Sequence, residues 1–295
     1  MIAGIDLGAS FIKAVVLDHE FRILTQRQTP TNDDHLTNAW MNEVRNMVSG
    51  LVKDYPEITM VGMSAPGIPS VDNSCIQFMP GRLPGLEGHN WAAYLGYPAF
   101  ILNDANAAML AESKLGVARG YDPVILLTLG TGVGGSILIN GRLFTGYKQV
   151  GGHLGHLTVD MHSKVKSITG MPGSLEDAIG EASLSYRTNG LYHSTRDLIH
   201  AVKRGDDEAK KIWTESVLAL AISLAALGNV ISPQLVVLGG GIVAAGDLLL
   251  DPLGAFLNEY EWRPGGKQFE LKLATAGSYA GAIGAGIFAS EKNTL

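Results

Sequence analysis

The chain has 295 residues, of which 46% are apolar and 17% are charged, so it can bury the core of one large domain or of two lobes that share a cleft. Its net charge of −6 and the absence of any basic run exclude the electrostatic footprint of a nucleic-acid-binding protein. The single cysteine, Cys75, excludes an internal disulfide framework and a multi-cysteine metal site.

No segment has the pattern of a signal peptide or of a membrane span. The sequence begins directly with an apolar strand rather than with a charged leader and an apolar signal core. The most apolar stretch, 217–238, is interrupted by Gly228 and Pro233, which favours a buried helix followed by a strand. We therefore expect a cytoplasmic protein that does not associate with membranes.

The first half alternates between expected strands and expected helices. Two apolar runs at 1–7 and 11–17 flank a turn of small residues, so they are expected to pair as a β-hairpin. Residues 66–90 are rich in proline and glycine and lack periodicity, which indicates a loop region over a site. Further strands are expected at 22–29, 58–63 and 99–102, and helices at 36–53 and 105–115.

The pattern of the first hairpin starts again near residue 120. A shift of 122 positions overlays Gly8 on Gly130 and Val15 on Ile137, which indicates two related lobes. The lobes are expected at 1–117 together with about 279–295, and at 118–278. The second half is expected to have strands at 124–129, 136–139, 235–238 and 269–275, an irregular segment at 141–175, and helices at 176–228, 247–258 and from about 278. These elements predict an α/β fold with mixed sheets.

Three clusters of small residues are candidates for binding phosphate. A phosphate group needs several backbone N–H donors close together, and side chains at those positions would block its approach. Each cluster alone is equally consistent with a simple turn, and neither a P-loop nor a helix-opening GxGxxG motif follows the first strand. Three clusters in order favour phosphate binding. The clusters are Gly8-Ala9-Ser10, Gly130-Thr131-Gly132 and Gly239-Gly240-Gly241.

Two charged residues accompany the first cluster. Asp6 ends the strand before the turn, where its carboxylate is well placed to hold a magnesium-bound water. An aspartate in a hairpin also bonds to its own turn in many proteins, so both readings stay open. Lys13 lies on the returning strand, where it would either neutralise phosphate or be solvated.

Asp104 is the candidate catalytic residue. A strand ends at Leu102 and a helix opens at about Ala105, so Asp104 falls in the N-cap region, where aspartate is a favoured cap. The positive end of the helix would keep the carboxylate ionised. An ionised carboxylate can orient a hydroxyl and accept its proton during phosphoryl transfer. Capping and catalysis are compatible roles for this residue.

These segments together resemble the ROK family of sugar kinases and repressors, in the actin-like ATPase or hexokinase-like superfamily. Order and spacing match over essentially the whole chain, and residues 103–107 and 130–134 are the most specific parts. The resemblance implies a two-lobed, ribonuclease H-like fold with mixed five-stranded sheets flanked by helices, and an active site in an interlobe cleft. The matching segments are 6–10, 103–107, 130–134, 152–156 and 239–241.

The resemblance also implies roles for individual residues. Asp104 would be the general base of a sugar kinase that uses ATP and Mg²⁺, and Asn103 would hold sugar hydroxyls. The turns at Gly8 and Gly130 would bind the phosphates of ATP, and 239–241 would lie near the adenosine. A homodimer is implied, for which the apolar helices near 215–228 could serve as interface or as core. The expected substrate-binding residues are Gly67, Arg82, Asn103, His153, His156 and Glu176.

The chain departs from the family at its zinc site. Most members bind a structural zinc through a histidine that matches His156 and through a cysteine-rich segment. The corresponding residues 167–174 of this chain contain no cysteine, and a tetrahedral zinc site needs about four nitrogen or sulfur ligands, so no zinc is expected. His156 would then face the ligand, brace a loop or be a structural histidine. Glu176 matches a sugar-contacting glutamate, and an acid is also favoured in the first turn of a helix.

Two further departures concern the sugar. His153 replaces a sugar-binding glutamate of the family, and Arg82 stands at or beside a sugar-binding asparagine. An arginine directed into a site prefers a carboxylate or a phosphate as its partner. An Arg82 exposed to solvent would indicate nothing about the substrate. The resulting hypothesis is a substrate other than unmodified glucose, such as an acidic or modified sugar.

Other functions stay open beside the leading hypothesis of an ATP-dependent sugar kinase. Repressors of the family carry a helix-turn-helix ahead of the first hairpin, whereas this hairpin is expected to start at residue 2. A non-catalytic sugar or nucleotide sensor is the main alternative, because the His153 and Arg82 positions are altered. A phosphoryl donor other than ATP, such as polyphosphate, is a further one.

Overall fold

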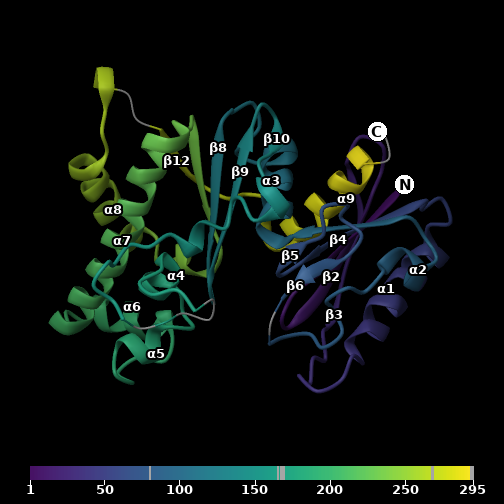
Figure 1. Cartoon of the computed structure of the whole chain (residues 1–295), viewed down its shortest axis with the longest axis horizontal. Helices are drawn as coiled ribbons and strands as arrows, with labels where there is room; N and C mark the ends of the chain where they lie inside the picture. Colours follow the sequence, from purple (N-terminus) through teal and green to yellow (C-terminus); the bar gives the residue numbers. More distant parts are fainter. Residues whose placement is uncertain (80, 165, 167–169, 267–268, 293–295) are drawn as a thin grey trace. The chain divides into compact units, whose positions relative to one another are not determined.

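The chain divides into two units, each with its own sheet and its own hydrophobic core (Figure 1). Unit 1 comprises Met1–Gly120, Leu143–Gly151 and Thr275–Leu295, and unit 2 comprises Tyr121–Arg142 and Gly152–Ala274. The computed structural model describes residues 1–79, 81–164, 166, 170–266 and 269–292.

The strands of unit 1 are β1 (Ile2–Leu7), β2 (Phe11–Leu17), β3 (Ile23–Pro30), β4 (Met60–Ala65), β5 (Ile68–Pro69), β6 (Ile76–Phe78) and β7 (Ala99–Asn103). Five of them form a sheet in the order β3-β2-β1-β4-β7, and β5 and β6 form a separate ribbon. β1 pairs antiparallel with β2, as predicted for the first hairpin, and parallel with β4. The register places Asp6 opposite Lys13 on one side and Ser64 on the other.

Helices cover both faces of the sheet of unit 1. α1 (Trp40–Asp54) packs on one face, and α3 (Asp104–Leu115) and α9 (Ala280–Lys292) pack on the other. Gly4 and Gly62 lie directly under α9, because a Cβ at either position would collide with the backbone of that helix. The two glycines therefore let α9 lie against the central strands at backbone distance.

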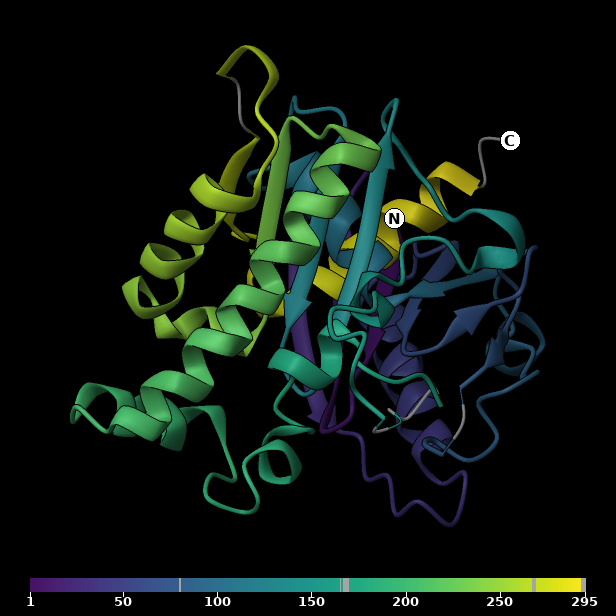
Figure 2. The ribbon, with the colours of Figure 1, turned by 60° about the vertical axis from the view of Figure 1, so that its left-hand side comes forward.

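The elements of unit 2 are β8 (Val124–Leu129), β9 (Val133–Ile139), β10 (Arg142–Leu143), β11 (Leu235–Gly239), β12 (Glu270–Leu273), α4 (Leu175–Ile179), α5 (Leu184–Arg187), α6 (Thr195–Lys203), α7 (Asp207–Ile231) and α8 (Asp247–Tyr260). The sheet has the order β10-β9-β8-β11-β12. β8 pairs antiparallel with β9 and parallel with β11, so the second hairpin has the pairing of the first. Figure 2 shows α7 running along one face of this sheet.

α7 is long and apolar enough to cross a membrane by length and composition alone. Within unit 2 it is a core helix, since its residues Trp213, Leu220 and Leu224 belong to the same buried cluster as the strands. The predicted buried helix followed by a strand is confirmed by α7 and β11. The apolar composition of this stretch is thus explained by packing inside unit 2.

Two expected elements of unit 1 differ from the structure. The helix expected at 36–53 begins at Trp40, because Asp34 Oδ1 accepts the N–H groups of Leu36 and Thr37 and holds them in a turn. The loop expected at 66–90 contains the ribbon of β5 and β6, and it is followed by a short helix, α2 (Trp91–Leu95), that was not expected. Five residues are too few for apolar periodicity to indicate a helix.

Candidate active site

Asp104 is the first residue of α3 and follows directly after β7. The N-cap of this helix is Asn103, whose Oδ1 accepts the N–H groups of Ala105 at 3.0 Å and Asn106 at 3.4 Å. Asp104 Oδ1 accepts one backbone N–H, from Ala105 at 2.8 Å. Because Asn103 caps the helix, the Asp104 carboxylate keeps further lone pairs for a substrate.

The Asp104 carboxylate has solvent-accessible surface and is at the same time crowded by protein atoms. This crowding removes part of its hydration and raises the pKa of Asp104 above its ordinary value. The Ala105 N–H, the Asn103 side chain and the positive charge of Arg82 oppose the increase. A carboxylate with a raised pKa is a stronger base than an ordinary aspartate, which suits a proton acceptor.

Asp6, near the end of β1, lies close enough to Asp104 for the two carboxylates to repel each other. Burial is the main reason that the pKa of Asp6 is raised to about 6, and the Asp104 charge adds to the increase. The Ser64 hydroxyl, which donates to Asp6 Oδ1 at 2.8 Å, opposes it. Two carboxylates that lose hydration and repel each other fit a divalent cation, since its charge would relieve the repulsion.

α9 begins beside the Asp6 carboxylate. Gly281 lies in the first turn of this helix, and a Cβ there would stand 2.5 Å from Asp6 Cγ. The missing side chain lets Asp6 approach the positive end of the helix. Lys13 Nζ donates to the Ser278 carbonyl at 2.8 Å, in the turn before α9, and its charge also attracts Asp6. Lys13 is therefore held in place beside Asp6, and phosphate binding by its ammonium group stays a prediction.

The first glycine turn joins β1 to β2 in unit 1. The Gly8 N–H donates to the Phe11 carbonyl at 3.1 Å, and the Thr31 hydroxyl donates to the Gly8 carbonyl at 2.7 Å. Ala9 and Ser10 are exposed, and within the described residues their N–H groups have no hydrogen-bond partner. The turn is thus fixed at both ends and presents two free donors, as an anion site requires.

Gly67 and Asn103, two predicted substrate-binding residues of unit 1, contact each other. The Gly67 carbonyl accepts a hydrogen bond from Asn103 Nδ2 at 3.1 Å, and Gly67 has φ +100°. The Asn103 amide is thereby engaged at both ends, which leaves one N–H for a sugar hydroxyl. Arg82 is half-buried and lines a pocket of about 310 Å³ in unit 1.

The second glycine turn joins β8 to β9 in unit 2. The Gly130 N–H donates to the Gly132 carbonyl at 2.9 Å, which closes the turn. The carbonyls of Gly130 and Thr131 accept the N–H groups of residues 181 and 182. In the described part of the chain, the N–H groups of Thr131 and Gly132 have no partner, so this turn also presents two donors.

Glu176, in the first turn of α4, contacts the second glycine turn. Its Oε2 accepts the Val133 N–H at 2.9 Å, and a Cβ on Gly132 would collide with this carboxylate. Glu176 therefore braces the turn, a role that sequence reasoning did not assign to it. Its predicted contact with the sugar stays a prediction.

The third glycine cluster meets the second at a pocket of about 550 Å³ in unit 2. Gly240 has φ +88°, and a Cβ there would collide with the Leu129 carbonyl at the end of β8. Gly241 lines the pocket together with Gly130 and Thr131. The volume lies in the range typical of small-molecule sites, so this pocket is the candidate nucleotide site.

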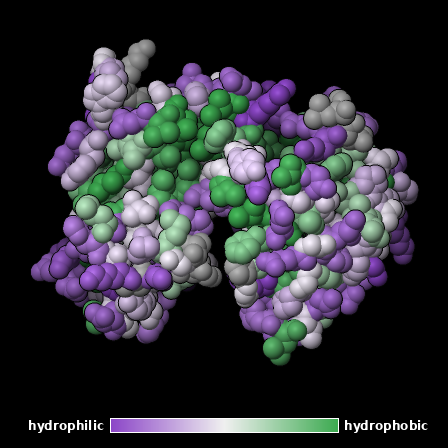
Figure 3. Space-filling view, in the orientation of Figure 1, coloured by the Kyte–Doolittle hydropathy of each residue, from purple (hydrophilic) through white to green (hydrophobic). Residues whose placement is uncertain are grey.

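Basic residues of α6 line the same pocket and were missed from the sequence. They are Arg196, His200 and Lys203, and their spacing of four and three residues places them on one helix face. Hydrophilic residues predominate over the region of α5 and α6 in Figure 3. Thr195, which opens α6, is 8% exposed, and its Oγ1 has no hydrogen-bond partner among the described residues. The helical spacing of the three basic residues was the signal available in the sequence.

His153 precedes a short 3-10 helix, η2 (Leu154–His156), in unit 2, and His156 is its last residue. Their rings are stacked, with centroids 6.1 Å apart and planes 8° from parallel. His156 Nδ1 is buried without a partner among the described residues. Among the same residues no group of three His, Cys, Asp or Glu could hold a metal, and 167–169 of the predicted zinc-less segment lie outside them. The absence of zinc stays a prediction.

The sequence model of the ROK family matches residues 2–292. This chain belongs to the ROK family. A glucokinase of Thermotoga maritima is 30% identical over 317 residues, covering 99% of this chain and 98% of that protein. The ROK hexokinase of Thermus thermophilus has a TM-score of 0.85 at 28% identity, with 99% of both chains covered. A ROK family glucokinase from Streptomyces griseus, solved with glucose and AMPPNP, has a TM-score of 0.80 at 26% identity over 98% of this chain and 99% of that one.

These likenesses confirm three predictions for this ROK family member. The family is the predicted one, and the fold is that of the actin-like ATPase sugar kinases, with mixed five-stranded sheets flanked by helices. The enzyme class is an ATP-dependent sugar kinase. The roles of single residues stay predictions.

Proposed function

We propose that this ROK sugar kinase transfers the terminal phosphoryl group of ATP to a sugar hydroxyl, with Asp104 as the general base. The observation that carries the proposal is the carboxylate of Asp104, which is relieved of helix capping by Asn103 and has a raised pKa beside Asp6. The glucose and ATP analogue bound to the relative from Streptomyces griseus support the same pair of substrates.

Asp104 acts on the acceptor hydroxyl. As the oxygen attacks the terminal phosphorus in line with the leaving ADP, its proton passes to the Asp104 carboxylate. The backbone N–H of Ala105 fixes one carboxylate oxygen, so the other is held toward the hydroxyl. Little covalent chemistry is required of the protein, and most of the rate comes from positioning and charge neutralisation.

Asp6 would hold Mg²⁺ through a bound water, close to where the phosphates lie. When bound, Mg²⁺ neutralises charge on the phosphate oxygens. This chain contributes the Asp6 carboxylate, and the repulsion between Asp6 and Asp104 is unfavourable until a cation is present. Ser64 keeps the Asp6 carboxylate in one orientation through its hydroxyl.

The donor nucleotide would occupy the glycine turns and the pocket of unit 2. The free N–H groups at 9–10 and 131–132 would bind phosphate oxygens, and 239–241 would lie near the adenosine. Arg196 and Lys203 supply positive charge along the wall of the pocket. Among the described residues, this lining contains no Asn, Gln, Phe, Tyr or Trp side chain, which leaves inorganic polyphosphate as an alternative donor to be tested.

In unit 1, three of the predicted residues would bind the acceptor sugar. Asn103 offers its remaining amide N–H, Gly67 positions that amide, and Arg82 lines the neighbouring pocket. His153, His156 and Glu176 are the predicted contributors from unit 2, and the buried unpartnered Nδ1 of His156 supports a polar contact there. The protein is expected to act in the cytoplasm.

Replacing Asp104 by asparagine tests the general base. We expect Asp104→Asn to lower kcat by about 10²–10⁴-fold in a coupled ADP-release assay with a panel of sugars, because the proton acceptor is lost. The Kd for ATP, measured by calorimetry, should stay within about twofold, since the glycine turns are unchanged. Asp251→Asn, an exposed residue of α8, is the matched control.

Two results would contradict the proposal. Turnover of the Asp104→Asn variant at the unsubstituted rate would remove Asp104 from the mechanism. Tight binding of sugar and ATP by the unsubstituted chain without any release of ADP would instead favour a sensor on the same fold.

A further inference from the structure

A pocket of about 310 Å³ in unit 1 has an arginine, a histidine and a glutamate in its wall. Arg82 and Glu87 come from the segment after β6, and His35 comes from the segment after β3. Pro84 lies between the two sides of the pocket wall. The lining therefore joins two loop segments that are about fifty residues apart in the chain, so the pocket depends on how these loops are fixed.

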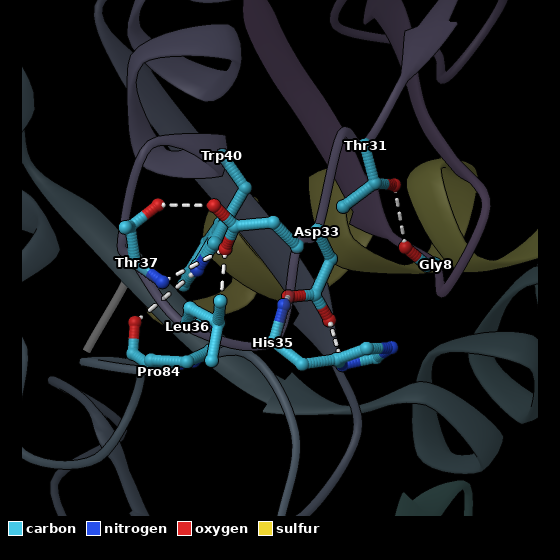
Figure 4. A network of polar contacts seen from close by, with 9 residues as sticks. Gly8, Thr31, Asp33, His35, Leu36, Thr37, Trp40 and Pro84 are labelled. Atoms are coloured by element: carbon cyan, nitrogen blue, oxygen red, sulfur yellow. Dashed lines mark hydrogen bonds and ion pairs between the residues drawn. The ribbon is translucent and has the colours of Figure 1, made fainter.

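The segment that carries His35 is held by several hydrogen bonds (Figure 4). The Thr31 hydroxyl donates to the Gly8 carbonyl at 2.7 Å, which ties the segment to the first glycine turn. Asp34 accepts the Thr37 N–H and hydroxyl, both at 2.8 Å. Trp40 Nε1 donates to the Pro84 carbonyl at 3.2 Å, which connects the two loop segments. These bonds fix the two loop segments that form the pocket wall.

Asp33 fixes the orientation of His35. Its side chain is 3% exposed, and its two oxygens contact His35 Nδ1 at 3.1 Å and the His35 N–H at 2.9 Å. His35 has φ +59°, a conformation that is uncommon for a residue other than glycine. Asp33 thus positions the backbone and Nδ1 of His35, and Nε2 of the 65% exposed side chain stays available for a ligand.

Arg82 provides the positive charge of the pocket. Its side chain is half-buried, and within the described residues no carboxylate lies within ion-pair distance of it. A guanidinium presents five donors in a planar fork that matches carboxylate and phosphate oxygens. An arginine held in a preformed pocket without such a partner fits an anionic group of a ligand.

The pocket adjoins the predicted catalytic carboxylate. The positive charge of Arg82 acts on Asp104, which places the two side chains in one electrostatic environment. Gly67, whose carbonyl binds the Asn103 amide, stands so close to Met79 that a Cβ would lie 2.8 Å from the Met79 Cβ. Met79 lines the pocket, so the pocket is continuous with the residues that flank Asp104.

We propose that this pocket binds an anionic substituent of the acceptor sugar, a carboxylate or a phosphate ester, through Arg82 and His35. The inference rests on the proposed sugar kinase function and names the substrate class of the same site. Arg82 donates two parallel hydrogen bonds to the anion, and the imidazolium form of His35, whose Nδ1–H faces Asp33, donates a third from Nε2. The acceptor hydroxyl is left to Asp104.

Glu87 is the group that opposes this proposal, because its carboxylate also lines the pocket. One of its oxygens accepts the Met79 N–H, so part of its hydrogen-bonding capacity is used within the wall. The opposite assignment, a cationic amino sugar bound by Glu87, makes the opposite prediction for each variant. Glu87 and Arg82 therefore form a pair of variants that discriminates between the two.

The test compares acceptors of different charge. ADP release is measured with glucose and mannose as neutral sugars, gluconate and glucuronate as carboxylates, glucose 1-phosphate as a phosphate ester, and glucosamine as a cation. We expect kcat/KM to be highest for an anionic acceptor, with the carboxylates and the phosphate ester showing which anion fits. Arg82→Gln should lower kcat/KM for that acceptor about 10- to 100-fold more than it lowers kcat/KM for neutral sugars. Glu87→Gln should raise it.

Controls separate this inference from the proposed function. Arg82→Lys keeps the charge without the fork and should give an intermediate loss, whereas Arg22→Gln, an exposed arginine paired with Asp18, should have no effect. Calorimetric titration of gluconate and glucose 1-phosphate without ATP tests the pocket even if no sugar is phosphorylated. A preference for glucose or glucosamine that Arg82→Gln leaves unchanged would overturn the inference alone, and absence of ADP release with every sugar would overturn the function.

Discussion

At the scale of single residues, Asp6 shows how this fold raises the pKa of a carboxyl group by packing protein atoms around it. The pKa of Asp6 is raised from 3.8 to about 6, chiefly by burial. At pH values between 3.8 and about 6, the native state binds more protons than the unfolded chain does. The free energy of unfolding therefore falls as the pH rises through this interval, and the cost of the ionised carboxylate is fully present at pH 7.

Replacing Asp6 by asparagine should therefore stabilise the protein while it abolishes turnover. We expect Asp6→Asn to raise the free energy of unfolding by about 1–2 kcal/mol at pH 7 and to have little effect at pH 4, where the native carboxyl is protonated. Urea unfolding at both pH values measures the difference, with the exposed Asp251→Asn as control. A loss of stability at pH 7 would show that Asp6 is a structural residue.

At the scale of elements, α3 carries functional groups at both of its ends. Asp104 opens the helix, and Glu112 in its last turns is 1% exposed. Glu112 Oε1 accepts the N–H groups of Thr275 and Ala276, both at 2.7 Å, and Oε2 accepts the Val117 N–H at 2.9 Å. Within unit 1, one buried carboxylate thus joins the segment after α3 to the segment before α9.

Removing this carboxylate should destabilise the chain strongly. Glu112→Ala leaves three partly buried N–H groups without an acceptor, so we expect a loss of about 2–4 kcal/mol in the free energy of unfolding, and about 1–2 kcal/mol for Glu112→Gln. Chemical denaturation measures both. Glu291→Gln breaks an exposed ion pair between Glu291 of α9 and Lys114 of α3, and it should lower the free energy of unfolding by less than about 1 kcal/mol. Equal effects of the three changes would contradict this role.

The elements show what the sequence could predict and what it could not. The hairpins and the strand before Asp104 follow from apolar periodicity, which depends on local neighbours. The N-cap region was predicted at Asp104, whereas the N-cap is Asn103. Both residue types cap helices, and the sequence does not show which of two adjacent ones will accept the N–H groups of the first turn. The contacts of Glu112 and Glu176 join distant segments, so no local pattern indicates them. The role of α6 was missed because its basic face has meaning only beside the glycine clusters.

At the scale of the whole molecule, the structure divides the chain at residues 120 and 274, and it groups Leu143–Gly151 with unit 1. No change of composition in the sequence indicates that Leu143–Gly151 belongs to unit 1. That the units act as lobes around a cleft stays a prediction, as does the homodimer. Apolar residues gather on unit 2 in the region of β12 (Figure 3), and α7 exposes Ile222 by 36% and Val230 by 77%.

The homodimer can be tested at this apolar surface. We expect the unsubstituted chain to sediment as a dimer at micromolar concentration, and Val230→Glu to sediment as a monomer, because an ionised side chain would be buried without a partner. Sedimentation velocity measures both species. Lys210→Glu, on an exposed position of the same helix, is a control that should stay dimeric. A monomeric unsubstituted chain would contradict the prediction.

The position of α9 has a consequence for the order in which the enzyme is assembled during synthesis. The residues that cover Gly4, Gly62 and Asp6 belong to the last helix of unit 1, which the ribosome makes after the whole of unit 2. Until that helix emerges, the central strands of unit 1 lack one layer and Asp6 faces water instead of Gly281. A nascent chain is therefore inactive until residues 280–292 have been made, and unit 2, whose core is contained between residues 121 and 274, can fold first.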